Sequence, residues 1–144
     1  LSDRHDTHVG VALATLRACR ALPSEARPSA VYGCEVWGGL DWLPDARKVR
    51  LPVDGDDELC RRLLAAHASQ IAGGKRYDEA TLGRRAANAT FDESHRTDEA
   101  RGVVFAMDLT PLCAAPRFEP AEFVAELAAA FAAETTQRIR ARLP

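Results

Sequence analysis

The sequence lacks a long apolar run, a hydrophobic leader and an excess of charge of one sign. No stretch approaches the roughly 18 consecutive apolar residues of a membrane-spanning helix, and no basic, apolar and small-residue segment of the signal-peptide type is present. The 19 Lys and Arg residues nearly balance the 21 Asp and Glu residues, giving a formal net charge of −2. Nucleic acid and membranes are therefore excluded as main partners, and we expect a soluble, cytoplasmic protein.

The sequence also lacks a Cys-x-x-Cys pair. Its four cysteines are scattered among apolar neighbours: Cys19, Cys34, Cys60 and Cys113. We therefore expect buried, reduced thiols rather than disulfides. A structural zinc site built from His5, His8 and cysteines is disfavoured, because the cysteine spacing offers no ligand pair.

The length of 144 residues suits one domain with its own core. Apolar residues recur at helical spacing over residues 8–21, 57–71, 78–91 and from 120 onwards. Three runs are typical of strands, namely residues 30–37, 47–53 and 102–109, and residues 111–120 are expected to form a loop. On the 57–71 helix, Leu59, Leu63, His67 and Ile71 share one face, where His67 is expected to be half-buried. Because helices and strands alternate, the sequence predicts the α/β class.

Two histidines stand three residues apart where the first expected helix begins. His5 precedes this helix and His8 lies in its first turn, where Asp6 or Thr7 can cap the free amides. The spacing places both rings on one side, within about 5–6 Å between Cβ atoms if the segment is helical. The positive end of the helix dipole favours the neutral imidazole that a metal binds. A zinc centre needs about three protein ligands, so the pair alone does not complete one, and two exposed histidines in a capping region are the alternative.

The strand at 30–37 carries an acidic residue in an apolar setting. Glu35 lies beside Cys34 in this run, and an ionised carboxylate buried without a partner is costly. Glu35 must therefore reach a solvated pocket or pair with a cation. Trp37 and Trp42 follow, and they either line a cleft of the size of a sugar or pack in the core.

Four stretches together resemble the C-terminal portion of the LmbE-like, or PIG-L, family of zinc-dependent de-N-acetylases. They are residues 3–10 (DRHDTHVG), 32–37 (YGCEVW), 69–78 (SQIAGGKRYD) and 84–91 (RRAANATF). The resemblance covers nearly all of the chain and implies a Rossmann-like sheet with flanking helices. Residues 1–144 are then a single domain fragment, the C-terminal part of a PIG-L or LmbE-type deacetylase domain.

The resemblance also implies roles for the two histidines. His8 matches a zinc ligand of the family, and His5 matches the catalytic histidine near the reacting carbonyl. Asp6 and Thr7 stand where the family has Pro and Asp, so the carboxylate that orients the catalytic histidine is displaced by one position, to Asp6. The His-Pro-Asp-Asp-Glu segment that supplies two further zinc ligands and the general base does not occur in these 144 residues. The zinc is therefore expected to be shared with an N-terminal segment of the same protein, and this chain alone is expected to be inactive.

The reaction implied by the resemblance is hydrolytic removal of an acetyl group from an N-acetylglucosamine-like amide or a related thiol-sugar conjugate. His5 would stabilise the oxyanion or protonate the leaving amine. Glu35 and Trp37 are the candidates for a pocket wall that meets the hydroxyls and the ring of this small-molecule substrate.

The sequence leaves the partners and one alternative function open. The N-terminal segment can be part of the same chain or a separate chain after cleavage, and a homo-oligomer is compatible with the sequence. Without its N-terminal part, the sheet would expose an edge and apolar surface, so we expect poor solubility or obligate association. The alternative is a non-catalytic binding or scaffold domain that retains the family fold without metal.

Overall fold

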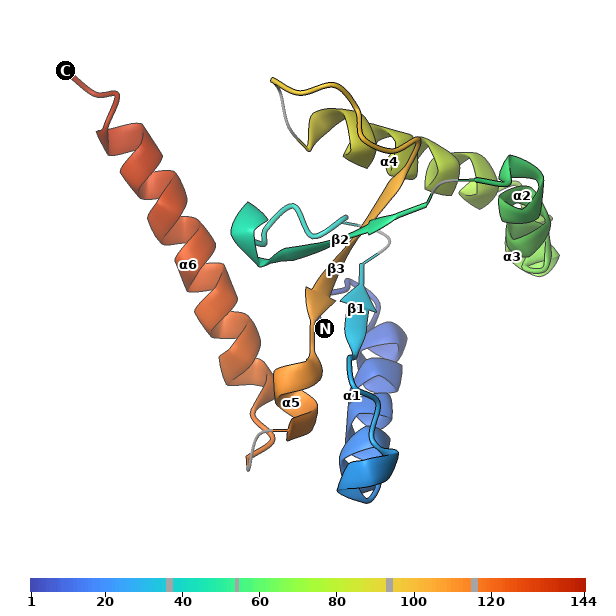
Figure 1. The fold of residues 1–144 in the computed structure, drawn as a ribbon, viewed down its shortest axis with the longest axis horizontal. Helices are drawn as coiled ribbons and strands as arrows, with labels where there is room; N and C mark the ends of the chain where they lie inside the picture. The colour runs from blue at the N-terminus through green and yellow to red at the C-terminus, as the bar shows by residue number, and fades with distance from the viewer. Residues whose placement is uncertain (36–37, 54, 93–94, 115–116) are drawn as a thin grey trace. The chain divides into compact units, whose positions relative to one another are not determined.

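The computed structural model describes residues 1–35, 38–53, 55–92, 95–114 and 117–144. The chain contains both helices and strands (Figure 1), which confirms the mixed α/β class. The helices are α1 (Asp6–Ala21), α2 (Asp57–Ala65), α3 (Ala68–Ile71), α4 (Tyr77–Phe91), α5 (Thr110–Ala114) and α6 (Pro120–Arg140). The strands are β1 (Tyr32–Cys34), β2 (Lys48–Pro52) and β3 (Val103–Asp108), and two short 3-10 turns are η1 (Ser24–Ala26) and η2 (Asp45–Arg47). Within the described ranges, no helix combines the length and apolarity needed to cross a bilayer.

The three strands form one small sheet in the order β1-β3-β2. β1 runs antiparallel to the central β3, with Gly33 opposite Met107. Of the described residues in the run 30–37 expected from the sequence, β1 comprises residues 32–34, which pair with β3. A Rossmann-like sheet goes beyond what these three strands show, and it stays a prediction.

The chain divides into two compact units. The first comprises Leu1–Val49 together with Phe105–Pro144, and the second comprises Arg50–Val104. The expectation of one domain over residues 1–144 stays a prediction.

The core of the first unit is made by leucines from several elements. Its buried residues come from α1, the loop after β1, the end of β3, α5 and α6: Leu16, Leu40, Leu43, Met107, Leu109, Leu112, Cys113 and Leu127. Helices α1 and α5 pack against each other, and Arg20 Nη1 on α1 donates to the carbonyl oxygen of Leu112 at 2.7 Å. This packing fixes the position of α1 against α5. The two histidines lie at the N-terminal end of α1.

Helix α5 corrects the expectation of a loop over residues 111–120. The chain turns into α5 directly after β3, and Asp108 Oδ1 accepts a hydrogen bond from the Thr110 amide at 2.9 Å. A helix of five residues is too short to show a helical period in the sequence. Its stability comes from burial of Leu112 and Cys113 in the core.

The second unit corrects the expectation of one continuous helix over residues 57–71. Asp56 caps α2 as its sequence position suggests, because its Oδ1 accepts from the Leu59 amide at 3.0 Å. The helix then ends, and α3 begins after His67. Leu59 and Leu63 are 47% and 62% exposed, and His67 is exposed, so the face predicted to be inward is not buried.

The four cysteines are free thiols, as expected, but their burial is uneven. Cys113 is buried, whereas Cys34 is exposed, which corrects the expectation that all four are buried. Burial raises the pKa of the Cys113 thiol, and the neighbouring Cys19 adds to this effect. Although Cys34 as a residue is exposed, partial desolvation of its sulfur raises the pKa of its thiol.

Alkylation with iodoacetamide is therefore expected to distinguish these thiols. We expect Cys34 to react at least about tenfold faster than Cys113 in the folded protein, because the reagent needs both access and a thiolate. The pKa of the Cys34 thiol is raised from 9.0. The thiolate fraction, and with it the rate of alkylation of Cys34, should therefore still increase as the pH rises above 9.0. Mass spectrometry of the alkylated peptides measures both rates, and unfolding in denaturant should make them similar. Equal rates in the folded protein would show that the α1–α5 contact does not shield Cys113.

Candidate functional site

The structure places the two histidines together where α1 begins. The helix starts at Asp6, so His5 is the residue before it and His8 lies in the first turn, as predicted. Their ring centroids are 5.0 Å apart, with the ring planes inclined by 42°. Neither Asp6 nor Thr7 caps the helix, because the N-cap position is His5 and it makes no side-chain cap bond. The short spacing therefore brings both imidazoles to one place, which is suitable for joint action on one ligand.

Asp3 is the third member of this cluster. Its Oδ2 lies 3.1 Å from His8 Nδ1, and its Oδ1 accepts from the His5 amide at 2.8 Å. The Asp3 side chain is only 11% exposed, against 53% for His8. The resemblance gave Asp6 the role of orienting the catalytic His5, and no role was predicted for Asp3. In the sequence, Asp3 stands out only as a carboxylate five residues before His8. This spacing does not correspond to a helical period, so it does not predict the contact.

The electrostatics of Asp3 favour an ionised carboxylate. Partial desolvation raises its pKa, but the hydrogen bonds from the His5 amide and the His8 ring outweigh this and hold the pKa below 3.8. An ionised carboxylate accepts a hydrogen bond from the Nδ1–H group of His8, which leaves the lone pair of Nε2 available. Metal-binding histidines in proteins commonly have such a carboxylate on the other ring nitrogen.

The cluster supplies only part of what a zinc centre needs. Across the described parts of the chain, no group of three or more His, Cys, Asp and Glu side chains is placed to hold a metal ion. Asp3 is engaged by His8 and the His5 amide, so the two imidazoles are the candidate donors. A catalytic zinc has about three protein ligands and an open position. His8 can therefore contribute a ligand, but the described residues do not complete the set.

Glu35 belongs to a different set of contacts. Its Oε2 accepts from the Trp42 indole Nε1 at 3.2 Å and from the Leu40 amide at 3.3 Å. A Cβ atom at Gly38 would lie 2.8 Å from Glu35 Oε1, so glycine permits this close approach. A solvated pocket or a cation was predicted as the partner of Glu35, whereas the structure shows an indole N–H and an amide. Trp37, the other predicted pocket residue, lies outside the described residues.

These contacts hold the loop after β1 in an uncommon conformation. Leu40 has a positive φ of 60°, and its side chain is 1% exposed in the core. Such a backbone conformation costs roughly 1–3 kcal/mol in a residue other than glycine. Burial of the Leu40 side chain and the bond from its amide to Glu35 offset this cost. Glu35 thus has a structural role, and its contact with a substrate stays a prediction.

Substitution of Glu35 by alanine is expected to lower the free energy of unfolding by about 1–3 kcal/mol, because it leaves two half-buried donors without their acceptor. Urea unfolding followed by circular dichroism measures the change. Glu25→Ala is the matched control, since Glu25 also accepts a bond from a near neighbour, Ser24, but is exposed. That change should stay within about 0.5 kcal/mol. Equal effects of the two substitutions would show that Glu35 does not fix the loop.

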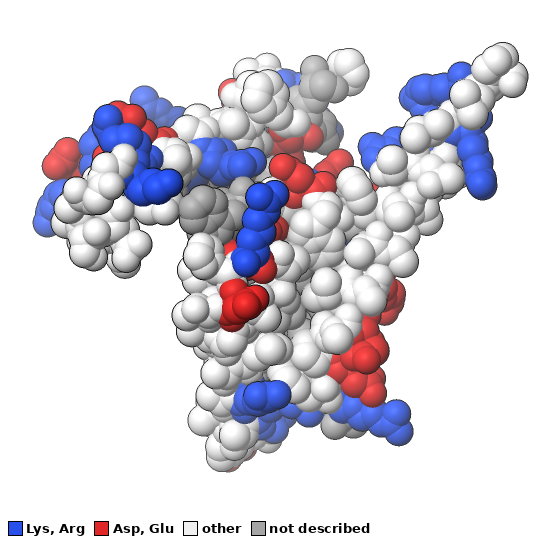
Figure 2. All heavy atoms as spheres, turned by 180° about the vertical axis from the view of Figure 1, so that it is seen from behind, with Lys and Arg blue, Asp and Glu red and all other residues white. Residues whose placement is uncertain are grey.

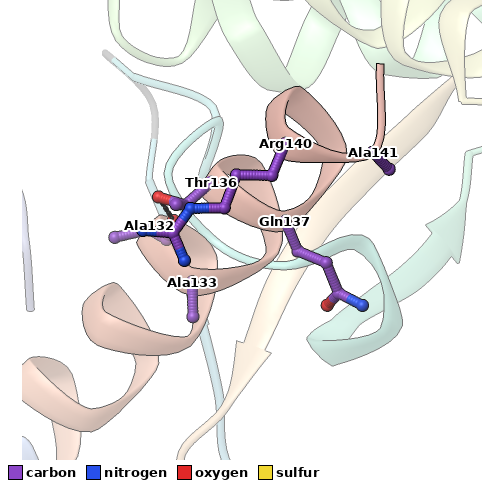
Figure 3. A pocket seen from close by; sticks show the side chains of 6 residues that line it. All are labelled: Ala132, Ala133, Thr136, Gln137, Arg140 and Ala141. Atoms are coloured by element: carbon purple, nitrogen blue, oxygen red, sulfur yellow. Dashed lines mark hydrogen bonds between the residues drawn. The ribbon is translucent and has the colours of Figure 1, made fainter. Parts of the chain in front are cut away.

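A hollow on α6 has a different character. Its volume is about 610 Å³, and the residues that line it all belong to α6 or its C-terminal turn: Ala132, Ala133, Thr136, Gln137, Arg140 and Ala141 (Figure 3). This lining contains small and neutral side chains with a single charged group and no carboxylate, histidine or cysteine. The hollow is thus an exposed helix face, and its chemistry does not fit hydrolysis.

Comparisons with protein-family models, with curated proteins and with solved structures found no match to this chain. The resemblance to the LmbE-like family therefore rests on the four stretches quoted above, and it stays a prediction.

Proposed function

We propose that the chain is part of a zinc-dependent N-deacetylase of the LmbE-like type, with Asp3, His5 and His8 on one side of its active site. The observation that supports this most strongly is the contact of His8 Nδ1 with Asp3 Oδ2 at 3.1 Å, next to a second imidazole at 5.0 Å. A carboxylate, an oriented histidine and a neighbouring histidine form a common catalytic arrangement at metal-assisted hydrolytic sites. The proposal includes a Rossmann-like domain of which these residues are the C-terminal part.

Each residue of the cluster has a distinct role in this proposal. His8 binds the zinc through Nε2, because Asp3 engages its Nδ1. When bound, zinc supplies the Lewis acid that polarises the amide carbonyl and makes water acidic enough to react at neutral pH. His5 stabilises the developing oxyanion or protonates the leaving amine. The remaining ligands and the general base come from an N-terminal segment, in the same chain or as a separate chain.

The proposed substrate is a small molecule with an acetylated amine on a sugar-like ring. Trp37 and Glu35 follow β1 and are the proposed pocket wall. Because one oxygen of Glu35 already accepts from Trp42 and Leu40, its second role would be to hold the loop that borders the pocket.

A non-catalytic binding or scaffold domain is the second candidate function. It is favoured by the lack of a three-donor metal group among the residues that the structure describes. The two candidates differ in one measurable property, because the scaffold has no zinc in the complete protein.

The test is intact mass together with zinc content, measured on the protein encoded by the complete reading frame. The deacetylase predicts an N-terminal segment, about one zinc per complex and release of acetate from N-acetylglucosamine-type amides. His8→Ala should abolish zinc binding, whereas His67→Ala, which alters an exposed histidine in the second unit, should not. A complete protein without zinc, or a His8→Ala protein that retains it, would support the scaffold instead.

A further inference from the structure

Helix α6 has a second apolar face, opposite to the one that packs in the core. Phe123 and Leu127 face the core of the first unit. The opposite face carries exposed small and apolar residues three or four positions apart: Ala121, Ala125, Ala128, Ala132, Thr136 and Ile139. Leu143 follows just beyond the end of the helix. Ile139 and Leu143 are 56% and 64% exposed. A surface helix normally has polar residues on its outer face, so this second face has the composition of a contact surface.

The polar groups on this face do not oppose burial. Thr136 is the one hydroxyl residue in the row, and its Oγ1 donates to the Ala132 carbonyl oxygen at 2.8 Å, within the helix. Figure 3 shows Ala132 and Thr136 side by side at the edge of the hollow, with this bond drawn. Because the hydroxyl already has a partner, covering it leaves no donor unsatisfied.

Charge is distributed along α6 in a way that selects the direction of a partner helix. Acidic residues lie in the first part of the helix, among them Glu122 and Glu126, whereas Arg138 and Arg140 lie in its last turn. Figure 2 shows the basic side chains gathered at the C-terminal end of this helix. Glu126 and Arg140 are separated by about four helical turns, so they lie on the same side of the apolar row. Two copies of α6 in opposite directions therefore bring Glu126 of each copy near Arg140 of the other.

The sizes of the apolar residues fit the same arrangement. The alanines dominate the first part of the row, and its one large residue, Ile139, stands at its end. In an antiparallel pair centred on Ala132, Ile139 of each copy meets Ala125 of the other. Large side chains then pack against small ones at both ends, which permits close approach of the helices.

We propose that this face of α6 is a docking surface for a second copy of the chain. The contact is an antiparallel, two-fold symmetric pair of α6 helices, in which the same residues are used by both copies. The proposal rests on α6 alone and is independent of the proposed deacetylase activity.

The first test is the state of association, measured by sedimentation of the 144-residue chain over a range of concentrations. We expect a reversible dimer, and Ile139→Ala should raise its dissociation constant by about 100-fold, because each dimer loses two buried isoleucines. Alanine is the better helix former, so the substitution leaves α6 intact. Leu63→Ala is the matched control, since Leu63 is 62% exposed on α2, and it should leave the constant unchanged. A monomer at all concentrations, or a dimer unaffected by Ile139→Ala, would overturn the proposal.

The second test establishes the direction of the helices. Glu126→Arg and Arg140→Glu should each weaken the dimer by about tenfold, since each places like charges together twice. A chain that carries both substitutions should dimerise as the original does. In a parallel pair residue 126 faces itself, so neither single exchange would weaken the dimer, and that result contradicts the proposed geometry. A complete protein that stays monomeric because a preceding segment covers Ile139 would also contradict the proposed docking of a second copy.

Discussion

Replacement of Leu16 by alanine is expected to lower the free energy of unfolding by about 2–5 kcal/mol. Leu16 lies on α1 with 1% of its surface exposed, in one cluster with residues of α5 and α6. Its truncation removes apolar contact and leaves a cavity that these short elements cannot fully close. Denaturant unfolding followed by circular dichroism at equilibrium measures the loss.

Val11 provides the matched control on the same helix. It is 61% exposed, so Val11→Ala removes little buried surface and replaces a β-branched residue with a better helix former. We expect a change within about 0.5 kcal/mol, or a small gain in stability. If the two substitutions have the same effect, α1 is not anchored through Leu16, and the position of its first turn is then not fixed by the core.

The elements that the sequence predicts well are those with a long and regular pattern. The helices α1, α4 and α6 and the strands β2 and β3 lie where the apolar spacing placed them. These elements extend over enough residues for a period of 3.6 or 2 to be visible. The strand pairing is less predictable, because the antiparallel register of β1 on β3 depends on residues about 75 positions apart in the chain.

The errors occur where tertiary contacts decide the structure. The burial of Leu112 stabilises α5 although five residues show no period. Conversely, Leu59 and Leu63 have the spacing of a buried face but are exposed, since spacing alone does not show what covers a helix. The same limit applies to Ile139, whose exposure on α6 is visible only in the structure.

In the candidate site, too, contacts set by regular helix geometry were predictable from the sequence, whereas contacts made by irregular segments were not. The proximity of His5 and His8 follows from their spacing at a helix start, and the structure has them 5.0 Å apart. The partner of His8 was not predictable, because Asp3 precedes α1, where no regular geometry relates spacing to distance. The bond of Glu35 with the Trp42 indole depends on the turn between them, which the sequence indicates only by its glycines.

Replacement of Asp3 by asparagine is expected to weaken zinc binding by the complete protein by about 10- to 100-fold. The amide is uncharged and can present either an oxygen or an NH₂ group to His8 Nδ1, so it no longer holds the proton on that nitrogen. Competition with a chelator at neutral pH measures the zinc affinity. In the chain without metal, nitrogen NMR of the His8 ring reports the tautomer directly, and Asp3→Asn should shift it away from the Nδ1–H form.

The pH dependence of the pair follows from the lowered pKa of Asp3. The pKa of Asp3 lies below its ordinary value of 3.8. The contact between Asp3 and His8 therefore stabilises the folded chain at pH values above the ordinary pKa, and this stabilisation is lost as the pH falls through the lowered pKa. Zinc binding at neutral pH should therefore not depend on the titration of Asp3, and Asp3→Asn should have its full effect there.

Asp6→Asn tests whether Asp6, which the resemblance predicts to orient the catalytic His5, also affects the zinc ligand His8. Asp6 is exposed in the first turn of α1, while Asp3 Oδ2 meets His8 at 3.1 Å. If Asp3 orients His8, Asp6→Asn leaves both the tautomer and the zinc affinity nearly unchanged. If the complete protein instead loses zinc with Asp6→Asn and keeps it with Asp3→Asn, Asp6 rather than Asp3 supports the zinc ligand His8. The Asp3 contact would then serve only to hold the chain before α1 in place.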